Sequence, residues 1–224
     1  KSNAPWHYLI LSLFTTGIVS IQLLLLVYGF LPDFYNGLTG HDHIMVRLLG
    51  SILHTGITEE LCKILPVLFY FYKFKQNANP KHAILIGIFS GLGFAAFENL
   101  DYTERVAQNS VAMGYRAGES GVMIGALAAQ VNVMLRALSL VFLHAVWTGI
   151  FSYFVTVGVT FKSRLIALFV VGLTVSSVMH GFYNWFHSVQ GTLSALVCAF
   201  AFMLLYSYLT KLDQMLLSKK EISE

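Results

Sequence analysis

The stretch HTGITEELCKILPVLF, residues 54–69, places two adjacent carboxylates and one lysine inside an apolar run. The charged residues are Glu59, Glu60 and Lys63, and apolar side chains flank them on both sides. Charges in such surroundings are costly unless they pair, and inside a membrane they mark function by default. On a helix, Lys63 lies four residues after Glu59 and three after Glu60, so it can pair with both. A purely structural ion pair between helices is the alternative interpretation.

The composition assigns the chain to the multi-pass membrane class. Of its 224 residues, 56% are hydrophobic and 11% are charged, and the mean hydropathy is +0.68. Soluble domains carry about 25% charged residues. The net charge of +3 is small, and we expect a lipid bilayer and no nucleic acid as partner. Cys62 and Cys198 both lie in apolar runs and form no disulfide framework.

Apolar runs long enough to span a bilayer, about 20 residues each, predict an all-α membrane protein with about six transmembrane helices. We expect a single transmembrane domain over 1–224 with a catalytic core at about 46–187. The predicted spans cover residues 6–31, 46–72, 83–102, 136–159, 165–187 and 190–210.

A more polar segment, 103–135, separates the third and fourth spans. Its second half is apolar enough to lie on the membrane or to re-enter it. A single helix from Gly121 to Thr160 would be about 60 Å long at 1.5 Å per residue, which exceeds the bilayer. We therefore expect a short interfacial or re-entrant helix in 103–135, with a break near Asn132–Arg136.

Lysine and arginine are concentrated in the segments that six spans would place on one side of the membrane. These segments hold nine basic residues, and the opposite segments hold three, with Arg136 at the border. Because such residues favour the cytoplasmic side, both termini are expected to be cytoplasmic. The nine are Lys1, Lys73, Lys75, Lys81, Lys162, Arg164, Lys211, Lys219 and Lys220, and the three are Arg47, Arg105 and Arg116.

Four predicted spans carry ionisable residues at a similar depth. Glu60, Glu98, His144 and His180 each lie far enough from the cytoplasmic end of their helix to sit about 20–24 Å above the inner surface. Unrelated polar residues would not be expected to share one layer. The pattern predicts one polar site nearer the outer face of the membrane.

Helical spacing adds detail to this site. His180 and Asn184 are four residues apart, as are Phe94 and Glu98, so each pair shares a helix face. Gly87 and Gly91 form a small-xxx-small pair that would let the third span approach a neighbour closely. Pro66 is expected to kink the second span just below the two glutamates.

Four motifs together resemble the PrsW family of intramembrane endopeptidases, which are related to the type II CAAX prenyl endopeptidases. They are EELCK at Glu59–Lys63, FAAFEN at Phe94–Asn99, the histidine of FLHAVWTG, and HGFYN at His180–Asn184. The prenyl relatives carry an arginine after the double glutamate and a histidine in the second motif. Because Lys63 and Glu98 stand there, the resemblance favours the PrsW branch. It implies catalytic roles for Glu59, Glu60, Glu98, His144 and His180, with Asn184 as a supporting group. We add Lys63 and Phe94 as supporting residues of the predicted site.

The resemblance also implies a substrate class, a single-pass membrane protein such as an anti-sigma factor, cut near the extracytoplasmic face of a prokaryotic plasma membrane. Peptide hydrolysis needs an activated water, an acid for the leaving amine and donors for the oxyanion. We assign the base to Glu59 or Glu60 and an oxyanion donor to Asn184. Whether His144, His180 and Glu98 hold a catalytic zinc, or a glutamate activates water without metal, stays open.

Three other functions remain compatible with the residues. A proton-coupled transporter or channel also carries ionisable side chains at mid-depth, although such proteins usually show broken helices and repeats. The second is a CAAX-type prenyl endopeptidase. The third is a membrane scaffold without catalytic activity.

Overall fold

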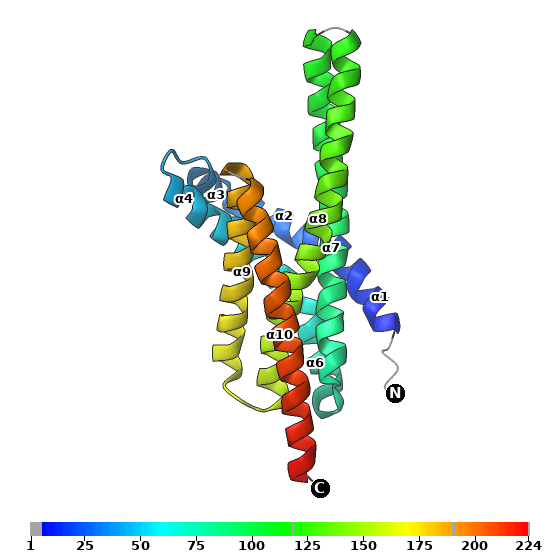
Figure 1. The fold of residues 1–224 in the computed structure, drawn as a ribbon, viewed down its shortest axis with the longest axis vertical. Helices are drawn as coiled ribbons and strands as arrows, with labels where there is room; N and C mark the ends of the chain where they lie inside the picture. The colour runs from blue at the N-terminus through cyan, green and yellow to red at the C-terminus, as the bar shows by residue number, and fades with distance from the viewer. Residues whose placement is uncertain (1–5, 118, 190, 224) are drawn as a thin grey trace.

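A computed structural model describes residues 6–117, 119–189 and 191–223, with most side chains of 101–139 outside the description. In these ranges the regular structure is entirely helical (Figure 1). The first half of the chain forms short segments: α1 (Trp6–Thr15), η1 (Thr16–Ser20), α2 (Ile21–Phe30), α3 (Pro32–Thr39), α4 (Ile44–Gly50), η2 (Ser51–Ile57), α5 (Thr58–Lys63), α6 (Leu65–Phe74) and η3 (Lys75–Asn77). The second half forms four long helices: α7 (Pro80–Ala117), α8 (Glu119–Thr160), α9 (Leu165–Val189) and α10 (Gly191–Ser223).

Within the described residues, five helices are long and apolar enough to cross a membrane, and each corresponds to a predicted span. The first combines α1, η1 and α2, which follow one another directly. The chain is therefore a multi-pass membrane protein. The five helices cover Trp6–Phe30, Pro80–Leu100, Leu140–Thr160, Leu165–His187 and Leu193–Ile222.

The predicted second span, 46–72, is not one continuous helix. It consists of α4, the π-helical η2, α5 and α6 in succession, and the regular pattern breaks at Ile64 between α5 and α6. Pro66 lies in the first turn of α6, as the expected kink requires. The prediction of a kink at this proline is confirmed, whereas the π-helical turn was not foreseen.

Neighbouring helices satisfy the backbone groups that this break releases. Pro66 has no N–H to donate to the carbonyl of Cys62, and the hydroxyl of Ser20 donates to that oxygen instead at 3.0 Å. The N–H of Val67 turns to the carbonyl of Ile64 at 3.0 Å. The carbonyl of Lys63 accepts a 2.5 Å hydrogen bond from the hydroxyl of Ser90 on α7. The kink is thus a fixed feature, because no freed carbonyl is left facing hydrocarbon.

Two glycines on α7 set the contact between α7 and α8. A side chain at Gly91 would be pressed against the main chain of His144 and Ala145, and one at Gly87 against Ser152. The small-xxx-small prediction is confirmed, and α8 is the neighbour that it requires. On the other side of the bundle, Gly56 of η2 lies against the backbone of Ser177 on α9 in the same way.

The segment 103–135 does not form the predicted interfacial or re-entrant helix. It is the outer part of α7 and α8, which continue without a break through Asn132–Arg136 and form a hairpin projecting beyond the spans (Figure 1). The length argument assumed that a helix must end at the bilayer surface. Two helices that pack along one another can continue past it, because each covers part of the other.

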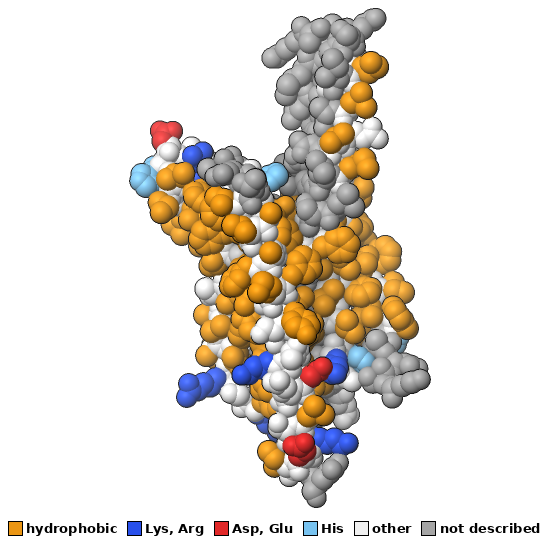
Figure 2. Space-filling model, viewed as in Figure 1, with side chains coloured by type: hydrophobic (Ala, Val, Ile, Leu, Met, Phe, Trp, Pro, Cys, Tyr) orange, Lys and Arg blue, Asp and Glu red, His pale blue; other side chains and the backbone are white. Residues whose placement is uncertain are grey.

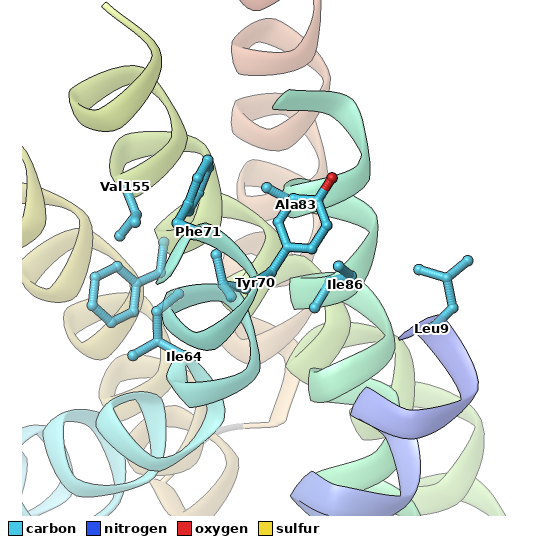
Figure 3. Packing of buried hydrophobic residues seen from close by; sticks show 9 residues of the cluster. Leu9, Ile64, Tyr70, Phe71, Ala83, Ile86 and Val155 are labelled. Carbon is cyan, nitrogen blue, oxygen red and sulfur yellow. The ribbon is translucent and has the colours of Figure 1, made fainter. Parts of the chain in front are cut away.

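A buried apolar cluster fills the interior on the opposite side of the kink from the glutamates. It joins α1, α6, α7 and α8, and Figure 3 shows Tyr70 toward Ile86 on one side of α6, with Ile64 and Val155 on the other. Figure 2 shows hydrophobic side chains over the middle of the visible face, with lysine and arginine gathered near its lower end. Figure 1 shows the start of α1 and the end of α10 in the lower half of the view.

We predict that Gly91→Ala lowers the stability of the bundle by about 1–3 kcal/mol, because the added methyl group forces α7 and α8 apart. Thermal unfolding of the purified protein in detergent measures this. Gly29→Ala is the matched control, since nothing lies within 4 Å of a Cβ at Gly29. Equal unfolding temperatures for the two variants would show that the close contact does not matter.

Candidate active site

The ionisable residues of four helices meet in one buried cluster. Glu59, Glu60 and Lys63 come from α5, Glu98 from α7, His144 from α8 and His180 from α9. All except Glu98, which is half-buried, are buried. The sequence predicted that these residues lie at one depth and form one polar site, and their meeting in one cluster confirms this.

Lys63 is the centre of this cluster. Its Nζ donates to Oε2 of Glu59 at 3.0 Å and to Oε1 of Glu60 at 2.9 Å. It also lies 2.6 Å from Nδ1 of His144 and 4.3 Å from the centre of the Phe94 ring. The pairing predicted from the i,i+3 and i,i+4 spacing is confirmed. A lysine with 0% exposure is stable here because three acceptors and an aromatic face replace its water.

Glu60 is held from several sides. Besides Lys63 on Oε1, its Oε2 accepts a hydrogen bond from the hydroxyl of Thr148 at 3.2 Å. Nδ1 of His180 lies 3.3 Å from Oε1. The side chain of Glu60 is 0% exposed. A carboxylate with both oxygens engaged and no exposure fixes its neighbours, and it has little room to bind a reacting water.

Glu98 lies on the open side of the cluster. Its side chain is 24% exposed, against 6% for Glu59. Oε2 of Glu98 lies 3.2 Å from Nε2 of His144. An ammonium group can only donate, so Lys63 makes Nδ1 of His144 an acceptor and leaves the ring proton on Nε2, facing Glu98.

Aromatic rings enclose the two histidines. The Trp147 ring stacks on His180 with centroids 4.3 Å apart and meets His144 edge-on at 5.4 Å. Phe94 lies 5.6 Å from His144 on the other side. Trp147 and Phe94 are both 0% exposed. These rings keep the imidazoles in place and exclude water from all but the Glu98 side.

Three side chains could hold a metal ion. Ligand atoms of Glu59, His144 and His180 all lie within 4.8 Å of one another. Oε2 of Glu59 lies 4.0 Å from Nδ1 of His144 and 3.8 Å from Nε2 of His180. The other ring nitrogens are buried against carboxylates, with Nε2 of His144 3.2 Å from Oε2 of Glu98 and Nδ1 of His180 3.3 Å from Oε1 of Glu60. One carboxylate and two imidazoles match the protein ligands of a catalytic zinc with an open position, so these residues fit a metal.

The metal set differs from the predicted one in a single member. The sequence interpretation combined His144 and His180 with Glu98, whereas Glu59 completes the group that converges. Glu98 contacts the outward nitrogen of His144 instead. Helical spacing shows which residues share a face of one helix, but it does not reveal which of two carboxylates from different helices approaches two histidines.

Asn184 is half-buried on α9, one turn beyond His180, and no described contact joins it to the cluster. Its supporting role stays a prediction. Two members of the site, Trp147 and Thr148, were not singled out from the sequence. They follow His144 by three and four residues, so the same i,i+3 and i,i+4 rule that paired Lys63 with the glutamates would have found them.

Comparison with known proteins yields one family. The sequence profile of the PrsW family intramembrane metalloproteases matches residues 4–209, nearly the whole chain. No curated protein and no solved structure gives a significant match. The match includes every helix that contributes to the cluster. The chain therefore belongs to the PrsW family of intramembrane metalloproteases.

Proposed function

We propose that the protein is an intramembrane endopeptidase that cleaves a single-pass membrane protein near the extracytoplasmic face of a prokaryotic plasma membrane. The observation that carries this is the convergence of Glu59, His144 and His180 from three helices, with Lys63 and Glu60 holding them. The family match supports peptide-bond hydrolysis over transport, and the PrsW profile supports this branch over the prenyl endopeptidases. An anti-sigma factor is the substrate class that the family resemblance implies, and we place the catalytic core at 46–187.

The position of the cluster along the helices supports the side of cleavage. Counted from the lysine-rich end, His180 lies 15 residues after the start of α9 at Leu165, and His144 lies 16 residues before the end of α8 at Thr160, about 22–24 Å into a hydrocarbon core of about 30 Å. Both are thus close to the end of the bundle opposite the lysine-rich end. With lysines on the cytoplasmic side, the reacting groups lie near the outer surface, where water and an extracytoplasmic segment of a substrate can reach them.

The three carboxylates take different roles in this proposal, and the base is Glu98 rather than Glu59 or Glu60, which the sequence interpretation favoured. Glu59 lies at the reacting centre with the two histidines. Glu60 orients Lys63, Thr148 and His180, because both of its oxygens are engaged. Glu98, the most exposed of the three, accepts a proton from the attacking water and then delivers it to the leaving amine, while Nε2–H of His144 orients this carboxylate.

A divalent metal fits this arrangement. Glu59, His144 and His180 would hold it, and it would supply a Lewis acid that polarises the scissile carbonyl and its bound water. Nδ1 of His144 now accepts from Lys63, and its single lone pair cannot serve the ammonium and a metal at once. Lys63 would then keep its two carboxylate partners and give up the imidazole.

We predict that Glu98→Gln lowers kcat about 10²–10⁴-fold while the protein keeps its metal, because the base is lost and the ligands remain. Glu59→Gln should lose both the metal and cleavage. Cleavage of a reconstituted single-pass substrate and elemental analysis of the purified variants measure the two effects. Full activity in Glu98→Gln would refute the base assignment.

The Glu60→Gln variant tests whether Glu60 positions its neighbours and takes no part in the chemical step. Because Glu60 pairs with a lysine that is 0% exposed, its neutral replacement should reduce the unfolding temperature more than Glu98→Gln does. A Glu60→Gln variant that is as stable as the parent but inactive would instead show that Glu60 acts in the chemical step.

We also predict that the purified protein contains about one divalent metal ion per chain and that a chelator abolishes cleavage, which zinc then restores. His144→Ala and His180→Ala should each lose the bound metal. Asp213→Asn, far from the cluster in a surface pair with Lys81, is the control and should retain it. Cleavage that continues in fully metal-free protein would refute the metal-dependent mechanism.

A further inference from the structure

A second candidate binding site lies at the lysine-rich end of the molecule, away from the active site. It is a cavity of about 620 Å³ where the end of α6, the start of α7, the end of α8 and the tail of α10 meet. Three lysines line it, Lys75, Lys162 and Lys219, and the described residues of its lining include no acidic side chain. The cavity therefore carries concentrated positive charge without an internal counter-ion.

The lining is amphipathic. Beside the three lysines, the cavity is bordered by Phe71, Val159 and Leu216, which belong to the apolar interior of the bundle. A small hydrated anion would gain nothing from these apolar walls. A phospholipid matches both parts, because its phosphate can meet the lysines while the first segments of its chains contact the apolar residues.

The backbone conformation at two of the lysines indicates that they are present for their side chains and not for the turn. Lys75 and Lys162 adopt positive φ angles of 47° and 51°. Glycine or asparagine takes up this conformation at lower cost, so lysine is not the residue that the turn itself favours. Lys219 is held in place, since its Nζ donates to the carbonyl of Thr160 at 3.1 Å and lies 5.4 Å from the centre of the Phe161 ring.

One acidic residue on α10 already has a partner outside the cavity. Asp213, on the same helix as Lys219, forms a 2.8 Å ion pair with Lys81. Pro80, the first residue of α7, lines the cavity, so the positive end of a helix dipole adds to the lysine charges. Figure 2 shows basic side chains at this level, just below the hydrophobic band.

We propose that this cavity binds the phosphate headgroup of one anionic phospholipid at the cytoplasmic surface of the membrane. The three lysines attract the phosphate, and the apolar walls contact the acyl chains, so that the lipid keeps its usual orientation in the bilayer. Basic pockets between transmembrane helices on the cytoplasmic side are suited to such headgroups. The site is separate from the cluster around Lys63, and the inference does not depend on the protease reaction.

The test is native mass spectrometry of the full chain in detergent with added phosphatidylglycerol or phosphatidylcholine of identical acyl chains. The parent protein should retain phosphatidylglycerol at least tenfold more tightly than phosphatidylcholine. The triple variant Lys75→Gln, Lys162→Gln, Lys219→Gln should lose that preference, with binding weakened about a hundredfold at most from three lysines. Equal retention of both lipids by the parent protein would overturn the proposal.

Two further variants separate this site from general surface charge and from misfolding. The triple variant Lys73→Gln, Lys211→Gln, Lys220→Gln removes the same charge from the same end but outside the cavity lining, and it should keep the preference. The triple arginine variant at 75, 162 and 219 should also keep it. Equal loss in both glutamine variants would overturn the proposal, as would full displacement of the lipid by millimolar glycerol phosphate.

Discussion

The buried ammonium group of Lys63 is the interaction on which the rest of the site depends. It joins two carboxylates of its own helix to an imidazole that lies 81 residues further along the chain. A buried charge is tolerated only where its partners lie within hydrogen-bonding distance, so α5 and α8 must come together at this point. The site and the packing of the bundle are therefore not independent. The same contacts that make the charges tolerable also place the reacting groups.

The chain is irregular on both sides of these charges. Glu59, Glu60 and Lys63 lie on the regular helix α5, where their spacing puts all three on one buried face. The π-helical η2 precedes α5, and a break at Ile64 follows it. Hydroxyl groups of Ser20 and Ser90 make the break affordable within hydrocarbon, because they bind the carbonyls of Cys62 and Lys63.

Much of this architecture was predictable, and the errors have definable causes. Hydropathy located five of the spans, and helix rise placed Glu60, Glu98, His144 and His180 in one layer, because both depend on distances along a single helix. The continuous course of α8 through Asn132–Arg136 was missed, since it depends on the partner α7. The approach of Glu59, rather than Glu98, to the two histidines was missed for the same reason, because contacts between helices leave no spacing pattern in one helix. The π-helical turn has no signature in hydrophobic periodicity.

The contact between Gly91 and the main chain of His144 has an additional consequence. Glu98 follows Gly91 by two turns of the same helix, so the separation of this carboxylate from the imidazole is determined by two backbones that touch directly. Side chains on the lipid-exposed surfaces of α7 and α8 take no part in that spacing. The surface can thus diverge to suit membranes of different thickness or lipid content while the chemistry inside is preserved.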